Sequence, residues 1–118
     1  MGTFRYTVEI SDLDRRHTET IDAFVDTGAA FTALPASFLQ SLGVRPIGQR
    51  RLLLADGTQV DMDYGRAWAT IDGESEITIV VFGQDNGPAL LGAYTLEGLS
   101  LAVDPVGHRL ISTAMIMY

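Results

Sequence analysis

The sequence contains neither cysteine nor lysine, and it has no long apolar run. Without cysteine the chain cannot form disulfide bonds, thiolate zinc sites, iron–sulfur clusters or a cysteine nucleophile. Without lysine it cannot form a Walker-type phosphate loop. Eight arginines stand against fifteen acidic residues, and the net charge of -7 provides no cationic field for nucleic acid or anionic lipid. The composition therefore argues against a nucleic-acid partner.

Membrane and export signals are also missing from the chain as given. No stretch reaches the roughly 18 consecutive apolar residues that a membrane-spanning helix needs. The first ten residues lack the basic start and the apolar run of a signal peptide. We therefore expect a soluble, cytoplasmic protein without a membrane partner.

What the sequence does contain is alternation of apolar and polar residues with a period of two, which is typical of half-buried strands. With 118 residues, 47% of them hydrophobic, the chain can bury one core, so we expect a single domain over residues 1–118. Asp-Gly pairs at 56–57 and 72–73 predict two tight hairpins. The predicted strands cover residues 4–10, a segment ending at 25, 47–54, 58–63, 67–71, 76–82, 101–103 and a closing strand from 109.

Two short helices complete the predicted fold. Pro35 at a first-turn position, apolar residues at helical spacing and Gly43 beyond them predict the first helix. A second is expected at about 94–99. The fold class is therefore mostly β, with two helical turns. Trp68 is expected in the core because large aromatic side chains are mostly buried.

Most catalytic and metal-binding templates fail on this sequence. His17 and His108 lie far apart and belong to no His-Glu-x-x-His helix, so we interpret them as surface residues near turns. Asp61 and Asp63 share one face of a strand, but they lack the ligand spacing of a calcium loop. We therefore predict neither a metal site nor a cofactor.

One motif remains, at the point where an apolar strand runs directly into Asp26, Thr27 and Gly28. A carboxylate at the end of a buried strand is costly unless it is hydrogen-bonded or shares a proton, so its position needs a reason. An Asx turn, in which Asp26 caps the chain reversal, explains the tripeptide equally well when it is taken alone.

The surroundings of this motif resemble the retropepsin-like, or retroviral-type, aspartic proteases. Their hallmark is two apolar residues before Asp-Thr/Ser-Gly-Ala/Ser, and later two apolar residues and a glycine before a short helix. The matching segments here are Phe24-Val25-Asp26-Thr27-Gly28-Ala29 and Leu90-Leu91-Gly92. The Asp-Gly hairpin at 56–57 lies between them, where the family has its flap, and the likeness covers about residues 20–104.

The resemblance implies a single-domain acid-protease fold, a closed β barrel or sandwich with a flap hairpin and one or two short helices. It also implies a homodimer that cuts polypeptides, because one Asp-Thr-Gly supplies only one of two catalytic carboxylates. Asp26 would be catalytic, Thr27, Gly28 and Ala29 would form the active-site loop, and Gly92 would be a structural glycine. The flap would be made of Ala55, Asp56, Gly57 and Thr58, and the substrate pockets would be walled by Pro88 and Leu90. An ordinary solvent hairpin would carry the same flap sequence.

Two departures from the retroviral pattern concern the dimer. Retroviral enzymes follow the late glycine with an arginine that supports the dimer, whereas this chain has Ala93 and Tyr94. Residues also continue well beyond the second helix, as in the bacterial and cellular branch of the family, and they end in the apolar run 114–118. We expect this run to pair with its two-fold mate, and the alternative is a closing strand within its own core.

The sequence therefore predicts a homodimeric aspartic endopeptidase with Asp26 as the catalytic residue. The alternative is a catalytically silent dimeric module of the same fold that holds a peptide without cutting it.

Overall fold

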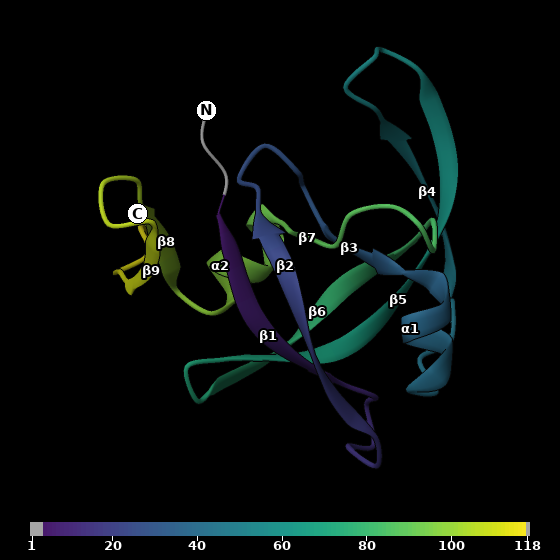
Figure 1. Ribbon diagram of the computed structural model, residues 1–118, viewed down its shortest axis with the longest axis horizontal. Helices are drawn as coiled ribbons and strands as arrows, with labels where there is room; N and C mark the ends of the chain where they lie inside the picture. The colour runs from purple at the N-terminus through teal and green to yellow at the C-terminus, as the bar shows by residue number, and fades with distance from the viewer. Residues whose placement is uncertain (1–3, 118) are drawn as a thin grey trace.

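The computed structural model describes residues 4–117 and has a mostly β architecture with two short helices (Figure 1). In chain order the elements are β1 Arg5–Ser11, β2 Thr18–Val25, β3 Thr32–Pro35, α1 Ala36–Ser41, β4 Gly48–Leu53, β5 Gln59–Ile71, β6 Glu74–Gly83, β7 Leu90–Leu91, α2 Ala93–Gly98, β8 Leu101–Asp104 and β9 Arg109–Ser112. The predicted fold class is confirmed, including a hairpin at each Asp-Gly pair. Within residues 4–117, neither helix has the length and apolar character needed to cross a bilayer.

Seven strands form the main sheet, in the order β1-β2-β7-β3-β6-β5-β4. Because β1 also pairs with β5, six of these strands close into a ring, and β4 lies outside it in a hairpin with β5. The pairs β2–β7 and β3–β6 are parallel. The short strand β7 therefore lies between β2 and β3 and brings the segment 90–92 to the end of β2.

Alternate side chains of the ring strands fill its interior. In β1, Val8 and Ile10 are fully buried. In β5 the buried residues are Gly65, Ala67, Ala69 and Ile71, and the residues between them are half-buried or exposed. Strand β6 differs, because its consecutive residues 78–82 are all buried and both helices pack against it. This strand therefore joins the two helices to the sheet.

The first helix follows its predicted boundaries. Pro35 is the N-cap with φ of -55°, the value to which its ring restricts it, and Leu39 is fully buried. Gly43 has φ of +81°, the left-handed conformation with which many helices end. Its N–H donates to the Gln40 carbonyl at 3.0 Å, which satisfies one of the last carbonyl groups of the helix.

The predicted strands 58–63 and 67–71 are in fact one continuous strand, β5, so the predicted break between them is wrong. Gly65 lies at the proposed break, but it allows a close approach of two backbone segments. A Cβ atom on it would lie 2.6 Å from the Arg45 carbonyl oxygen. Strand β3 was not predicted, because four residues are too few to show a clear alternation.

The expectation that Trp68 belongs to the core is also wrong. Trp68 is half-buried and points to the outer side of β5, since alternate residues of this strand face the interior. Its indole N–H donates to the Leu13 carbonyl at 3.1 Å, and the Arg15 guanidinium lies 3.8 Å from the ring centroid. The ring therefore supports the β1–β2 turn from outside.

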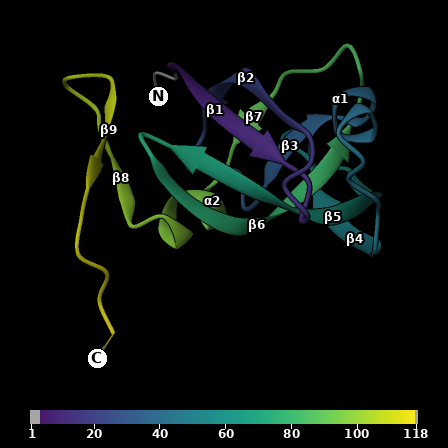
Figure 2. The ribbon, with the colours of Figure 1, turned by 90° about the horizontal axis from the view of Figure 1, so that it is seen from below.

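The last two strands, β8 and β9, form a separate two-stranded sheet that stands beside the main sheet (Figure 2). Leu101 and Leu110 bury one side of it against the core. Residues 114–117 form no strand, and Ile116 and Met117 are 93% and 78% exposed. Tyr118 lies outside the described residues. A closing strand within the protein's own core is therefore wrong for residues 114–117.

Candidate active site

The Asp-Thr-Gly motif forms the loop that leaves the buried end of β2. Val25 is in the core, Asp26 is half-buried, and Thr27 and Gly28 are exposed. The Asp26 N–H donates to the Leu91 carbonyl at 3.0 Å, which continues the parallel pairing of β2 with β7. The chain then reverses, and the Ala29 N–H donates to the Asp26 carbonyl at 3.1 Å. The Asp26 side chain is thus held at the surface by a buried strand pair.

The Asp26 carboxylate accepts a hydrogen bond from the Gly28 N–H, with 3.0 Å between nitrogen and Oδ1. This is the Asx turn that the tripeptide alone suggests. A Cβ atom on Gly28 would lie 3.2 Å from the same oxygen, so a side chain would crowd the carboxylate. The Gly28 N–H therefore fixes one oxygen of the Asp26 carboxylate. The carboxylate remains accessible to solvent because Asp26 is only half-buried.

The segment at Gly92 crosses very close to the chain that follows the Asp26 loop. A Cβ atom on Gly92 would lie 2.4 Å from both the carbonyl carbon and the oxygen of Phe31. Beyond this crossing, the Ala93 N–H donates to the Ala29 carbonyl at 2.8 Å, and the Tyr94 N–H donates to the Ala30 carbonyl at 3.0 Å. The start of α2 is therefore bonded to the end of the Asp26 loop.

A buried group of threonines fixes this crossing from the inside. The Gly92 N–H donates to Thr32 Oγ1 at 3.1 Å. Thr95 Oγ1 lies 2.6 Å from Thr32 Oγ1 and 2.8 Å from Thr78 Oγ1. All three hydroxyl groups are buried, and each has a partner, as buried polar groups require. The network joins β3, β6 and α2 beneath the Asp26 loop.

Sequence reasoning missed these threonines. Each lies in an apolar stretch and is separated from its partners by many residues, so no local pattern connects them. For Thr78 the alternation even misleads, because it places this residue on the same side as Glu76, whereas all of residues 78–82 are buried.

The predicted flap residues form the tip of the β4–β5 hairpin. The Leu54 N–H donates to the Thr58 carbonyl at 2.8 Å, and Gly57 has φ of +88°. The Thr58 hydroxyl donates to Asp56 Oδ1 at 2.6 Å and the Thr58 N–H at 2.9 Å, which lowers the pKa of the Asp56 carboxyl below its usual value. In Figure 1 this hairpin and the loop between β2 and β3 project toward the same edge of the molecule.

Of the predicted pocket residues, Pro88 precedes β7 and Leu90 is the first residue of this strand. Leu90 is half-buried, and its backbone pairs with Phe24 on one side and with Ala33 on the other. Pro88 is exposed at the start of this segment. Both residues are therefore near the strand that ends at Asp26.

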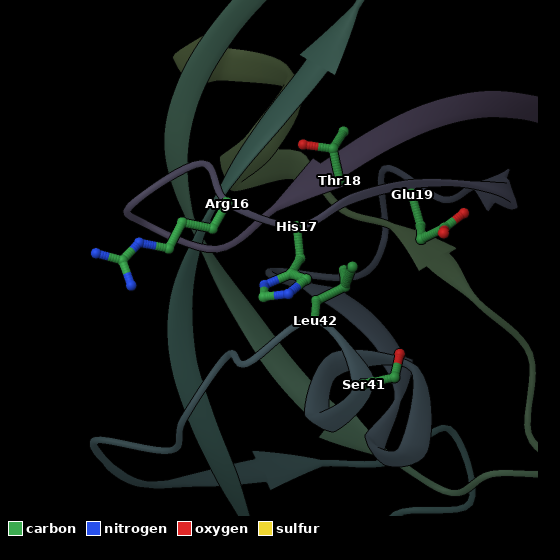
Figure 3. A pocket seen from close by; sticks show the side chains of 6 residues that line it. All are labelled: Arg16, His17, Thr18, Glu19, Ser41 and Leu42. Atoms are coloured by element: carbon green, nitrogen blue, oxygen red, sulfur yellow. The ribbon is translucent and has the colours of Figure 1, made fainter.

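One surface depression lies away from the Asp26 loop. It has a volume of ≈ 360 Å³ and is lined by Arg16, His17, Thr18, Glu19, Ser41 and Leu42 (Figure 3). It lies at the start of β2, about 23 Å along the strand from Asp26 at 3.3 Å per residue. Side chains there point in divergent directions, and no group of three or more metal-ligating residues occurs within residues 4–117. This depression is therefore separate from the Asp26 loop.

The fold and the loop together define an aspartic-protease architecture, and the comparisons with known proteins agree. A family model described as aspartyl protease matches residues 7–95. Since this range covers most of the chain, the chain belongs to the aspartyl protease family. No curated protein sequence matches it.

Solved structures of retroviral and bacterial proteases have the same fold. EIAV protease in complex with an inhibitor has a TM-score of 0.61 at 18% identity, with 93% of each chain covered. A retropepsin-like aspartic protease from Rickettsia conorii has a TM-score of 0.54 at 20% identity, covering 88% of this chain and 90% of its own. Simian foamy virus protease has a TM-score of 0.53 at 20% identity, covering 78% and 92%. The retropepsin-like fold predicted from the sequence is therefore confirmed.

The crossing at Gly92 gives a first prediction. In Gly92→Ala the new methyl group meets backbone atoms at 2.4 Å, so we expect a loss of about 3 kcal/mol in the free energy of unfolding, measured by urea denaturation. The matched control is Gly98→Ala at the end of α2, where a Cβ atom would lie an ordinary 3.7 Å from Glu76 Cγ. Equal midpoints for the two variants would contradict the close crossing.

Proposed function

We propose that two copies of this chain form an aspartic endopeptidase, and that each copy contributes one Asp26 to a single site on the two-fold axis. The observation that carries the proposal is the half-buried, accessible Asp26 carboxylate at the end of β2, held by Leu91 and Gly28 in a chain of the aspartyl protease family. The chain contains the Asp-Thr-Gly sequence only once, so the second carboxylate comes from a second copy. In this proposal residues 1–118 act as one domain.

The reaction follows from two carboxylates placed about 3 Å apart, which share one proton because like charges so close do not both ionise. The ionised Asp26 removes a proton from a water molecule, and the water oxygen attacks the carbonyl carbon of the peptide bond. The protonated Asp26 of the other copy donates to the carbonyl oxygen. When the tetrahedral intermediate collapses, the amide nitrogen takes up a proton and the C–N bond breaks. The chemistry requires no metal or cofactor.

The loop residues have distinct roles in this proposal. The Thr27 hydroxyl hydrogen-bonds across the two-fold axis and keeps the two loops in register, and its exposure in one chain supports this role. Gly28, also exposed, lets the two backbones approach each other. Ala29 anchors the loop to α2 through its carbonyl.

The substrate cleft lies between the flap and the Asp26 loop. The tip residues Ala55 to Thr58 close over a bound peptide, which excludes water from the reacting bond. Pro88 and Leu90 wall the side-chain pockets beneath it. The projection of hairpin and loop toward one edge of the molecule supports this arrangement (Figure 1).

The C-terminal segment supplies part of the dimer interface in this proposal. Leaving Ile116 and Met117 in water forfeits on the order of 25 cal/mol for each Å² of apolar surface. The β8–β9 sheet has only two strands within the described residues, and its edges can pair with a further strand. Strands from a second copy would cover the apolar run and extend this sheet, which compensates for the arginine that the chain lacks after Gly92.

The proposed chemistry predicts a pH profile and a loss of activity. Cleavage of an unfolded protein should follow a bell-shaped profile with its optimum below neutral pH, because the pair of acids must hold one proton. Asp26→Asn should lower kcat by on the order of 10³-fold or more. The control is Glu19→Gln, an exposed carboxylate at the opposite end of β2. A rate that rises steadily into alkaline pH, or activity that survives Asp26→Asn, would contradict the assignment.

The proposed interface predicts the effect of deleting residues 114–118. Because residues 114–117 are exposed on their own chain, the truncated protein should keep its far-UV circular dichroism but become a monomer without protease activity. Mass in solution, measured beside the spectrum, checks this. A truncated chain that stays a fully active dimer would show that the interface lies elsewhere.

A further inference from the structure

The two faces of the β4–β5 hairpin differ in chemistry. Arg51 lies opposite Asp61, and Gln49 lies opposite Asp63. On the other face, Leu52 lies opposite Val60, and the pair at the next position is Arg50 with Met62. One face of the hairpin therefore carries charged and amide side chains, with the exposed Leu53 opposite Gln59 near the tip, and the other is largely apolar.

The register of β5 identifies which face is the inner one. Side chains along a strand alternate, so Asp61 and Asp63 share a face with Gly65 and Ala67, which point into the core. Strand β5 pairs without interruption with β4 over residues 59–64 and with β6 over residues 64–71. No bulge therefore shifts side chains from one face to the other between the core and the hairpin. The polar face is therefore continuous with the interior of the ring, on the side of the cleft in the proposed enzyme.

The apolar face is covered by its own side chains. The Arg50 guanidinium lies 4.2 Å from the centroid of the Tyr64 ring, and the Leu52, Val60 and Met62 side chains are half-buried. This face needs no further partner. The inner face remains open, with Arg51 and Asp61 71% and 50% exposed.

Arg51 forms an exposed ion pair with Asp61 on this inner face. Its Nε donates to Asp61 Oδ1 at 3.2 Å. That contact uses one of the five N–H donors of the guanidinium, and the other four lie on the two terminal nitrogens. A guanidinium matches a carboxylate through two parallel hydrogen bonds.

We propose that Arg51 is a specificity residue of the flap, which binds an acidic side chain of the peptide substrate when the hairpin closes. The inference rests on the proposed function, since it takes the hairpin to be a flap. Asp61 and Asp63 on the same face oppose an acidic peptide at short range, and the net charge of -7 opposes it at long range. Salt screens the long-range repulsion beyond about 8 Å, and the two terminal nitrogens of Arg51 contact the peptide directly. A site with this property selects a substrate peptide that carries an acidic residue beneath the flap, whereas a purely apolar site selects apolar side chains alone.

The test measures peptide binding without cleavage, in the Asp26→Asn protein. The probes are two pools of fluorescent random octapeptides that differ only in carrying Glu or Gln at one central position, and the readout is fluorescence anisotropy. The Glu pool should bind about tenfold more tightly than the Gln pool, and adding Arg51→Ala should abolish the difference. Adding Arg50→Ala instead removes the same charge from the opposite face and should preserve it.

The outcomes separate this inference from the proposed function. Equal affinity of the two pools, no binding of either pool, or equal effects of Arg51→Ala and Arg50→Ala would overturn the role of Arg51. The protease assignment is judged separately, by cleavage with the unmodified chain. A Glu preference that depends on Arg51 in a chain that cuts nothing would support the inference and overturn the protease.

Discussion

The arrangement of the candidate site depends on one close crossing, where the backbone at Gly92 passes against the backbone of Phe31 with no room for a Cβ atom. Because the two segments touch, the start of α2 reaches the carbonyls of Ala29 and Ala30 and bonds to them. Buried hydroxyls beneath the crossing supply the Gly92 N–H with its acceptor. A side chain at this position would separate α2 from the loop and leave buried donors without partners, which is more costly than the lost contacts themselves.

The crossing holds the Asp26 loop on one side only and leaves its other side exposed to solvent. Backbone hydrogen bonds to Leu91 and to the start of α2 hold the loop on its inner side. On its outer side Asp26 is half-buried and Thr27 is exposed. The contacts that position one carboxylate are therefore inside one chain, and in the proposed dimer the second carboxylate comes from the other copy. The exposed apolar run at 114–117 and the separate β8–β9 sheet are consistent with a partner of the same kind. In the proposed enzyme, catalysis therefore depends on assembly of the dimer.

The sequence predicted features with local causes. Alternation located most strands, the Asp-Gly pairs located two hairpins, and Pro35 and Gly43 bounded the first helix. Local sequence patterns did not predict the features that depend on residues distant in the chain. The predicted break between residues 63 and 67 contains Gly65, whose role is to admit the carbonyl of Arg45, which only the fold brings near. Trp68 looked like a core residue, because hydrophobicity does not show to which side of a strand a side chain points. The pairing of Asp26 with the segment before Gly92 came from resemblance to a family, since nothing in either segment alone indicates the other.

The central claim is that each active site contains Asp26 from two chains, and mixing the parent chain with Asp26→Asn tests it most directly. Equal amounts are unfolded together, refolded so that subunits exchange, and assayed for cleavage at constant total protein. Random pairing places two intact carboxylates in about one quarter of the dimers, so activity should fall to about a quarter of that of the parent chain and follow the square of its fraction. Activity that falls only to one half, in proportion to the parent chain, would show that each chain works alone and would contradict the shared site.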